Sequence, residues 1–409
     1  MIRICRARVL FSRSMLAAFL TGSFKGERAK VRVIKQFEDN FALYLGVKYA
    51  VAVSSGKIAL YICLKILKAK DKDEIILPSY TVPEVVDVII ACGLRPVFVD
   101  ISLEHGTMNA ELVEKMIGER TKFILMTHMY GNPCNIEAIL QLSQKYDLTV
   151  IEDAAQACGT EYQGKKAGTF GKLGYFSFGI LKNLNTLGGG MIVTDDEVLA
   201  GSIRTYISDF KPIRKFELMK RFVTALSLSM ATHPIVFSLL VYPAMYFSGY
   251  GRKNNADNFL KQPLLTPEKV EELKMLYSGE QAAMGLVQIL YLDALNSKKI
   301  ENADILNRYL CGHDKIRIFQ ENQGRRNIYL NYVIMVKGRD ELIKHLFCKG
   351  IDLSPGFVVS CAHLQRFREF FNDCPNSKAL EDNNLYIPIY SPLKKNHMLR
   401  ISEGIRTWG

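Results

Sequence analysis

The sequence contains few of the patterns that bind metals or nucleic acids. Its nine cysteines include no CxxC pair and its seven histidines show no paired spacing, so we expect no metal site. The odd number and wide spacing of the cysteines favour reduced thiols in a cytoplasmic protein. Zinc-finger spacing, aromatic RNA-binding signatures and basic heptad helices are also absent. The net charge of +12 therefore favours anionic lipid or phosphorylated small molecules as partners, and not nucleic acid.

Acidic residues are missing from the first 25 residues, which contain several arginines. A transit peptide has this composition, but the only apolar run here, residues 15–20, is short for a secretory signal. We expect an amphipathic helical arm over residues 1–30 instead. The whole chain has 409 residues, 48% of them hydrophobic and 23% charged, which is enough for two domains and a large core.

Helix-like and strand-like segments alternate along residues 31–210. The first helix, residues 31–45, places Val33, Phe37, Phe41 and Leu45 on one face. Strands are expected at 49–53, 74–77, 97–100, 123–127 and 149–152, with helices at 58–67, 82–91, 110–117 and 136–146 between them. Such alternation predicts parallel βαβ units, hence an α/β domain with its active groups at the carboxyl ends of the strands.

The most informative stretch is GYFSFGILKNLNTLGGGMIVT, residues 174–194, in which Lys182 is the only charged residue. Apolar neighbours remove water from its ammonium group and lower the pKa. A neutral amine is what Schiff-base chemistry with a carbonyl or with pyridoxal phosphate requires. The three glycines that follow permit a tight turn. A lysine at a strand end is more often a solvated surface residue, so the local pattern alone leaves both interpretations open.

Two other patterns lie at strand ends. Ser54-Ser55-Gly56-Lys57 separates a strand from a helix, where free N–H groups and the helix dipole bind phosphate. The alternative is an ordinary serine cap. Asp153 follows an apolar strand, and in a pyridoxal-phosphate site such a carboxylate pairs with the protonated pyridine nitrogen. The alternative for this residue is a helix cap.

Several motifs occur together in the order and spacing of one family. They are SSGKIAL, EIILPSYT, GLRPVFVD, HMYGNPCNIEAI, VIEDAAQACGTEYQGKKAGTFG, and FSFGILKN with GGGMIVTDD. With QFEDNFALYLGVKYAVAVSSG upstream and GEQAAMGLVQILYLDAL downstream, the chain resembles the DegT/DnrJ/EryC1/StrS family of sugar aminotransferases. The resemblance is close over residues 26–210, resumes near residue 273 and thins after residue 325.

The resemblance implies a type I pyridoxal-phosphate aminotransferase fold. Its large domain would hold a mostly parallel sheet of the seven-stranded type, followed by a smaller C-terminal α/β domain. The expected division is an N-terminal helical arm at 1–30, a cofactor-binding domain at 31–210, a hydrophobic helical insertion at 211–262, and a linking helix with the small domain at 263–409. Enzymes of this family work as homodimers whose active sites are built from both subunits.

The resemblance also implies roles for individual residues. Lys182 would be the Schiff-base lysine and the acid/base of the proton shift, and Asp153 would pair with the pyridine nitrogen. Gln156 would contact the ring hydroxyl. The remaining cofactor-binding positions would hold the phosphate: Ser55, Gly56, Lys57 and Ser177 from one subunit, and Lys274 from the other.

The sequence departs from the family pattern at several of these positions. Lys57 replaces a threonine or serine, Val82 a ring-stacking aromatic, and Gly179 a histidine or aromatic. Lys274 stands near a family asparagine and can still approach a phosphate as a point charge. Near residues 354–356 the family's substrate-side histidine and tyrosine are missing. These changes concern the substrate more than the cofactor.

We therefore expect a transaminase that takes an amino group from an amino acid, typically glutamate, and passes it to a nucleotide-linked keto-sugar for amino-sugar or surface polysaccharide biosynthesis. Two alternatives stay open. One is a pyridoxal-phosphate enzyme of the same fold with another reaction, either dehydration or amination of a non-sugar ketone. The family's dehydratases lack the lysine, so Lys182 argues against dehydration. The other is a non-catalytic, membrane-associated binding protein.

The insertion is the largest departure. Residues 222–250 contain no Asp, Glu, Lys or Arg, and basic residues such as Lys211, Lys220, Arg252 and Lys253 flank them. A single span would separate the two domains that share the active site. Because Pro234 and Pro243 are expected to break the run into shorter helices, we predict a hairpin or helix pair lying on the inner face of the membrane. The alternative is a buried helical pair at an oligomer interface.

Overall fold

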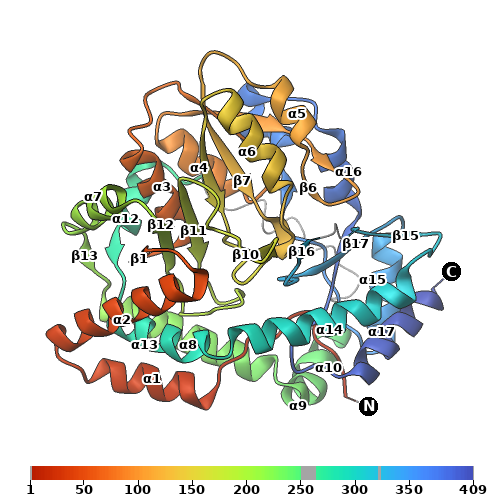
Figure 1. The fold of residues 1–409 in the computed structure, drawn as a ribbon. Coiled ribbons are helices and arrows are strands. Elements are labelled where there is room, and N and C mark those ends of the chain that lie inside the picture. Colours follow the sequence, from red (N-terminus) through yellow and green to blue (C-terminus); the bar gives the residue numbers. More distant parts are fainter. Residues whose placement is uncertain (1, 250–263, 321–323, 409) are drawn as a thin grey trace.

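The computed structural model describes residues 2–249, 264–320 and 324–408, and its centre is a seven-stranded sheet (Figure 1). The strand order is β1 (Tyr49–Val53), β12 (Gly190–Thr194), β11 (Leu173–Ser177), β8 (Thr149–Asp153), β7 (Thr121–Thr127), β2 (Glu74–Pro78) and β4 (Arg95–Val99). Only β12 runs antiparallel to its neighbours. The expected α/β fold with a mostly parallel sheet is confirmed.

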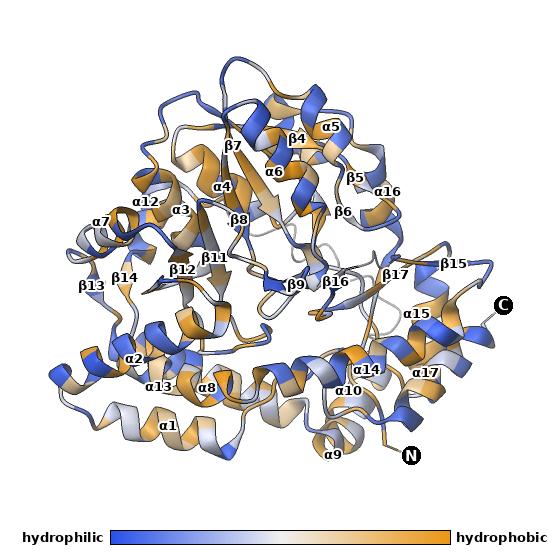
Figure 2. Cartoon of the chain, in the orientation of Figure 1, coloured by the Kyte–Doolittle hydropathy of each residue, from blue (hydrophilic) through white to orange (hydrophobic). Residues whose placement is uncertain are grey.

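Helices connect the parallel strands, as the alternation predicted. They are α3 (Gly56–Ile66), α4 (Pro83–Ala91), α5 (Ala110–Lys115) and α6 (Ile136–Lys145), and α7 (Glu197–Ile207) follows the antiparallel β12. The strands read as short continuous apolar runs because helices cover the sheet, and Figure 2 shows this hydrophobic colouring in the central strands. Asp153 ends β8 and Ser177 ends β11, so both lie at carboxyl ends of strands.

The turn before β12 depends on glycine. Gly188 and Gly189 have φ values of +104° and +105°. A Cβ on Gly189 would lie 2.3 Å from the ring of Tyr277, which belongs to the segment leading into α13 (Gly279–Ile289). Only glycine fits this close approach. The turn therefore returns the chain antiparallel to β11, next to the loop that carries Lys182.

A smaller domain follows the long helix α14 (Leu292–Leu310). Its antiparallel sheet has the order β15 (Ile316–Ile318), β17 (Tyr332–Val336), β19 (Asn384–Ile387), and α15 (Arg339–Cys348), α16 (Pro375–Asn383) and α17 (Lys395–Arg406) accompany it. The strand β17 does not cover the whole apolar segment IYLNYVIMV, residues 328–336. It begins only at Tyr332, because Tyr329 takes a positive φ of 47° that interrupts extended backbone.

The N-terminal arm is helical only from α1 (Arg13–Ser23), which is followed by α2 (Glu27–Leu45). The prediction of a helical arm beginning at residue 1 was therefore wrong for the residues before Arg13. Ile4 instead pairs with Ile351 in a parallel bridge, and Arg6 Nε donates to Asp352 Oδ2 over 2.8 Å. Pairing with the small domain outweighs the local tendency of these residues to form a helix.

The insertion forms α8 (Lys215–Ala231), the short α9 (Pro234–Val236), a π-helical turn (Phe237–Val241) and α10 (Tyr242–Phe247). The chain bends by 62° between α8 and α9, where Pro234 lies. The predicted break at Pro243 was wrong, because the helix continues through the π-helical turn directly into α10, and a proline is tolerated where such a turn already interrupts the regular i→i−4 hydrogen bonds. The expected pair of helices is present, and the end of the insertion at 250–262 lies outside the described residues.

Part of this helix pair is packed on the rest of the chain. Phe222 of α8 stacks on Phe19 of α1, and Tyr242 of α10 stacks on Phe347 of α15. Within the described residues, no single helix is long and apolar enough to cross a bilayer, although the bent pair 215–231 and 234–247 meets that length and composition together.

Candidate active site

A cavity of about 290 Å³ lies at the carboxyl ends of β8 and β11. Most of the residues that the sequence predicted for the cofactor line it. We call it the smaller cavity, because a larger one described below adjoins it. Its lining consists of Gly56, Lys57, Leu60, Thr81, Val82, Pro83, Glu84, Val85, Thr127, Met129, Asp153, Ala155, Gln156, Tyr175, Ser177, Lys182 and Phe357. The fold thus gathers side chains from segments more than a hundred residues apart in the sequence.

The first turn of α3 forms one end of the smaller cavity. Ser55 caps the helix, because its hydroxyl accepts the N–H of Ile58 over 3.2 Å. Gly56 faces Ser177, and a Cβ added to Gly56 would lie 2.9 Å from the Cβ of Ser177. The Lys57 ammonium lies 3.7 Å from the carboxylate of Glu84. Free N–H groups at a helix start beside a serine hydroxyl form a site suited to a phosphate group.

Asp153 lines this cavity and is buried. Burial raises the pKa of its carboxyl group, although Tyr175, the N–H of Ala155 and the charge of Lys182 all favour the ionised form. The N–H of Ala155 donates to Oδ1 over 2.9 Å. A buried carboxylate whose pKa remains raised is stabilised by an additional cation at this position.

Lys182 follows β11 in a short turn, in which its N–H donates to the carbonyl of Gly179 over 2.9 Å. Burial lowers the pKa of the ammonium group to about 8, against the attraction of Asp153 and Glu84. A substantial fraction of the amine is therefore neutral near pH 8. The pKa shift predicted from the apolar neighbours is present in the structure.

Gln156 also lies in the smaller cavity. Its Oε1 accepts the N–H of Tyr130 over 3.2 Å, and its Nε2 lies 3.3 Å from the sulfur of Met129. Since a thioether is a weak acceptor, the amide N–H groups keep most of their hydrogen-bonding capacity.

Lys274 does not line this cavity in its own chain. It lies over the rings of Tyr61 and Tyr206, and its ammonium group pairs with Glu271. Its expected role involves the other subunit, so this location within one chain leaves that expectation a prediction.

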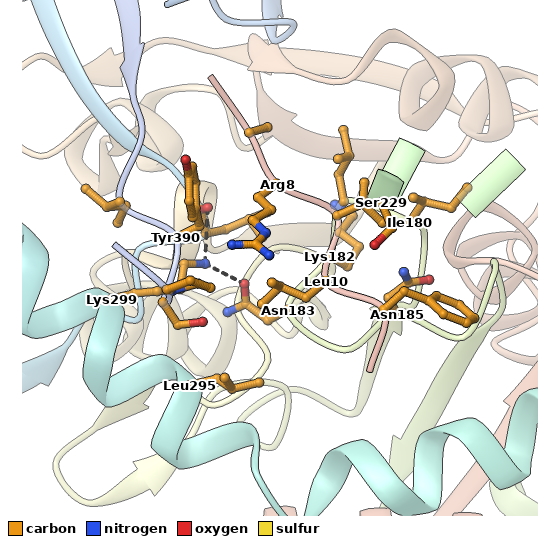
Figure 3. A pocket seen from close by; sticks show the side chains of 18 of the residues that line it. Arg8, Leu10, Ile180, Lys182, Asn183, Asn185, Ser229, Leu295, Lys299 and Tyr390 are labelled. Atoms are coloured by element: carbon orange, nitrogen blue, oxygen red, sulfur yellow. Dashed lines mark hydrogen bonds between the residues drawn. The ribbon is translucent and has the colours of Figure 1, made fainter. Parts of the chain in front are cut away.

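A larger cavity of about 720 Å³ meets the smaller one at Lys182 and Phe357, which line both. Figure 3 shows Arg8, Asn183, Lys299 and Tyr390 around it. Sequence reasoning missed these residues. Asn183 follows Lys182 in the quoted FSFGILKN motif, and that position was a usable signal. Arg8 was assigned to a helix, and Lys299 has no distinguishing sequence context.

The smaller cavity fits pyridoxal phosphate. The start of α3 and Ser177 would hold its phosphate, Asp153 would face its pyridine nitrogen, and Lys182 would bind its aldehyde carbon. The raised pKa of the Asp153 carboxyl supports this fit, since a protonated ring nitrogen supplies the missing cation. Val82 lines the cavity where the family often has an aromatic, so contact with the ring would be apolar.

Known proteins share both the sequence and the fold. The spore coat polysaccharide biosynthesis protein SpsC of Bacillus subtilis (strain 168) is 41% identical over 389 residues, which cover 91% of this chain and 88% of that protein. GDP-perosamine synthase of Escherichia coli O157:H7 is 28% identical over 380 residues, 92% of this chain and 90% of that protein. Alignment with some other relatives spans less than half of their length, 44% in one case.

The crystal structure of DesV from S. venezuelae superposes with a TM-score of 0.70 at 26% identity, covering 98% of both chains. The sequence model of the DegT/DnrJ/EryC1/StrS aminotransferase family matches residues 25–221 and 247–406. The lysine, the buried aspartate and the start of α3 line one cavity, and the chain belongs to the DegT/DnrJ/EryC1/StrS family of pyridoxal-phosphate-dependent aminotransferases.

Proposed function

We propose that the enzyme transfers an amino group from glutamate to a keto-sugar carried on a nucleotide. The observation that carries this proposal is the meeting of the two cavities at Lys182. The smaller one fits the cofactor, and the larger one, at about 720 Å³, has the size of a pocket for a drug-sized ligand or a nucleotide. The names of SpsC and GDP-perosamine synthase, which refer to polysaccharide and to a GDP-linked product, support this substrate class.

Some residues of the smaller cavity would hold the cofactor, and Lys182 would transfer protons. Bound pyridoxal phosphate supplies an electron sink for the bonds at the reacting carbon. Asp153 keeps the ring nitrogen protonated, and Ser177 with the N–H groups of Gly56 and Lys57 fixes the phosphate end. The Lys182 amine removes the proton from the α-carbon of glutamate and later delivers a proton to the sugar carbon. Over both half-reactions, the donor's amino group is replaced by oxygen from water, and the sugar's carbonyl oxygen leaves as water when the amino group takes its place.

Glutamate-dependent amination of nucleotide-linked keto-sugars, followed by chromatography of the products, tests this function. We expect an amino sugar and 2-oxoglutarate in equal amounts, and no product from Lys182→Ala. A deoxy sugar formed without an amino donor would instead establish the dehydration alternative. Turnover by Lys182→Ala equal to that of the native enzyme would refute the role of this lysine.

We also infer that the chain divides into the four parts named above, with boundaries at residues 30, 210 and 262. We further infer a homodimer in which Lys274 of each subunit approaches the cofactor phosphate of the other. The family relationship supports this assembly. Light scattering should give twice the chain mass, and Lys274→Ala should lose roughly 10-fold in cofactor affinity, the value of one charged hydrogen bond. A monomer with full cofactor affinity would contradict the assembly.

We further propose that the insertion contacts the surface of an anionic membrane. Its outer face exposes large apolar side chains, namely Phe216, Val223, Ile235, Leu239, Leu240 and Phe247. The basic residues Lys215 and Lys220 in the first half of α8, and Lys211 just before it, are also exposed. Basic residues beside an apolar helix face favour binding at a lipid interface.

Sedimentation with vesicles that contain anionic lipid tests the contact. We expect the enzyme to sediment with them, and the double variant Leu239→Glu/Leu240→Glu to stay in the supernatant with its activity intact. If vesicles do not bind the native enzyme while the double variant loses an oligomeric state, the face is an oligomer interface and the membrane contact is refuted.

A further inference from the structure

The larger cavity has a one-sided charge. None of the described residues that line it is an aspartate or a glutamate, whereas Arg6, Arg8, Lys182 and Lys299 all line it. Arg6 is neutralised by Asp352, which lies outside the lining. A cavity that concentrates positive charge without acids attracts anionic ligands.

Lys299 projects from α14 into this cavity (Figure 3). Its ammonium group donates to Asn183 Oδ1 over 2.7 Å and to the carbonyl of Leu330 over 3.3 Å. Among the described residues it forms no ion pair, and burial lowers its pKa to about 7. The neighbouring Lys298 differs, because it pairs with Glu301 at 2.6 Å. A buried lysine without a carboxylate partner is stabilised when an anion binds beside it.

Arg8 reaches the cavity from the N-terminal segment. The bridge between Ile4 and Ile351 and the Arg6–Asp352 ion pair hold this segment on one side. The N–H of Val9 donates to the Thr232 hydroxyl over 3.3 Å. Arg8 itself makes no hydrogen bond or ion pair within the described part of the chain, and its side chain points into the cavity (Figure 3). The segment is fixed while its guanidinium group remains available to a ligand.

We propose that Arg8 and Lys299 together bind the diphosphate group of the nucleotide-linked sugar, which places the sugar at Lys182. This inference rests on the proposed function and adds the residues that recognise the acceptor. A diphosphate carries two negative charges and suits two cations, of which arginine binds phosphate in bidentate fashion. The carboxylate of the amino donor carries one charge and is the competing ligand of the same chemistry.

Two variants and two matched controls test the inference. The variants are Arg8→Gln and Lys299→Gln, and the controls are Arg13→Gln at the exposed start of α1 and Lys298→Gln on the outer face of α14. Calorimetry with UDP, GDP and dTDP on the cofactor-loaded enzyme should show roughly 10-fold weaker binding for each variant. The controls should bind the nucleotide as the native enzyme does, and Arg8→Lys should lie between Arg8→Gln and the native enzyme.

The donor half-reaction shows whether Arg8 and Lys299 bind the diphosphate of the acceptor or the carboxylate of the donor. Its rate and glutamate affinity, followed by the change in cofactor absorbance, should be the same in Arg8→Gln and Lys299→Gln as in the native enzyme. If these variants weaken glutamate binding and leave nucleoside diphosphate binding unchanged, the cations bind the donor carboxylate and the inference is overturned. Failure of the proposed function would give a different result. The native enzyme would then bind nucleoside diphosphate through Arg8 and Lys299 but would transfer no amino group.

Discussion

Phe19 and Phe222 stack with their ring centroids 4.2 Å apart, and this contact joins α1 to α8 of the insertion. Both side chains are buried. Phe222→Ala should therefore lower the free energy of unfolding by about 3 kcal/mol, as for other buried phenylalanines. Phe216→Ala is the matched control, because Phe216 on the same helix is 81% exposed. Denaturant unfolding of both variants checks this, and equal stability would mean that α8 leaves the enzyme surface in solution.

The contact between Gly56 and Ser177 predicts a defect in cofactor binding. Because a Cβ on Gly56 would lie 2.9 Å from the Cβ of Ser177, Gly56→Ala must push the start of α3 away from β11. We expect a loss of roughly 10-fold in affinity for pyridoxal phosphate, measured by fluorescence titration, since the phosphate site loses its geometry. Gly201→Ala in α7, where a Cβ meets nothing within 4 Å, should bind the cofactor normally.

The lowered pKa of Lys182 predicts how cofactor attachment depends on pH. Only the neutral amine attacks the aldehyde, so the rate should rise as the ammonium group loses its proton. With the pKa lowered to about 8 by burial, and Asp153 and Glu84 opposing the shift, the rate should rise up to about pH 8 and then level off. Stopped-flow absorbance gives the profile. A rate that continues to rise to pH 10 would show an ordinary lysine.

Asp153→Asn should separate stability from activity. Burial raises the pKa of this carboxyl group in the folded chain, so its ionised form destabilises the cofactor-free protein above the unfolded-state pKa. The variant should therefore unfold at a higher temperature than the native protein at pH 8 without cofactor, and this difference should vanish near pH 4. Transamination should fall by roughly 100-fold or more, the scale for removing one preorganised charge. Calorimetry and product assays measure the two effects.

The large domain was predictable because its signals are local. Alternating periodicities placed the strands, and Asp153 lies at the carboxyl end of β8, where the pattern placed it next to an apolar strand. A few neighbouring residues are enough to indicate a reactive amine at the lysine in an apolar turn, and a phosphate site at the serine before a helix. The order of the motifs then placed them in one cavity.

The larger cavity could not be predicted, since its residues come from distant segments. Lys298 and Lys299 are adjacent lysines that the sequence does not distinguish. Only the packing of α14 turns Lys298 to solvent and Lys299 toward Asn183. Arg8 belongs to a segment with helical composition whose conformation is decided by Ile351 and Asp352. No periodicity within the first residues reports such a partner.

The attachment of the N-terminal segment also has a consequence for synthesis. Arg6 and Asp352 are separated by 346 positions, so during synthesis Arg6 lacks this ion-pair partner until Asp352 has left the ribosome. Until then, a nascent chain can fold its central sheet but has no wall on the Arg8 side of the substrate cavity. If this cavity binds the acceptor as we propose, a nascent chain should bind it only after the Arg6–Asp352 and Ile4–Ile351 contacts have formed.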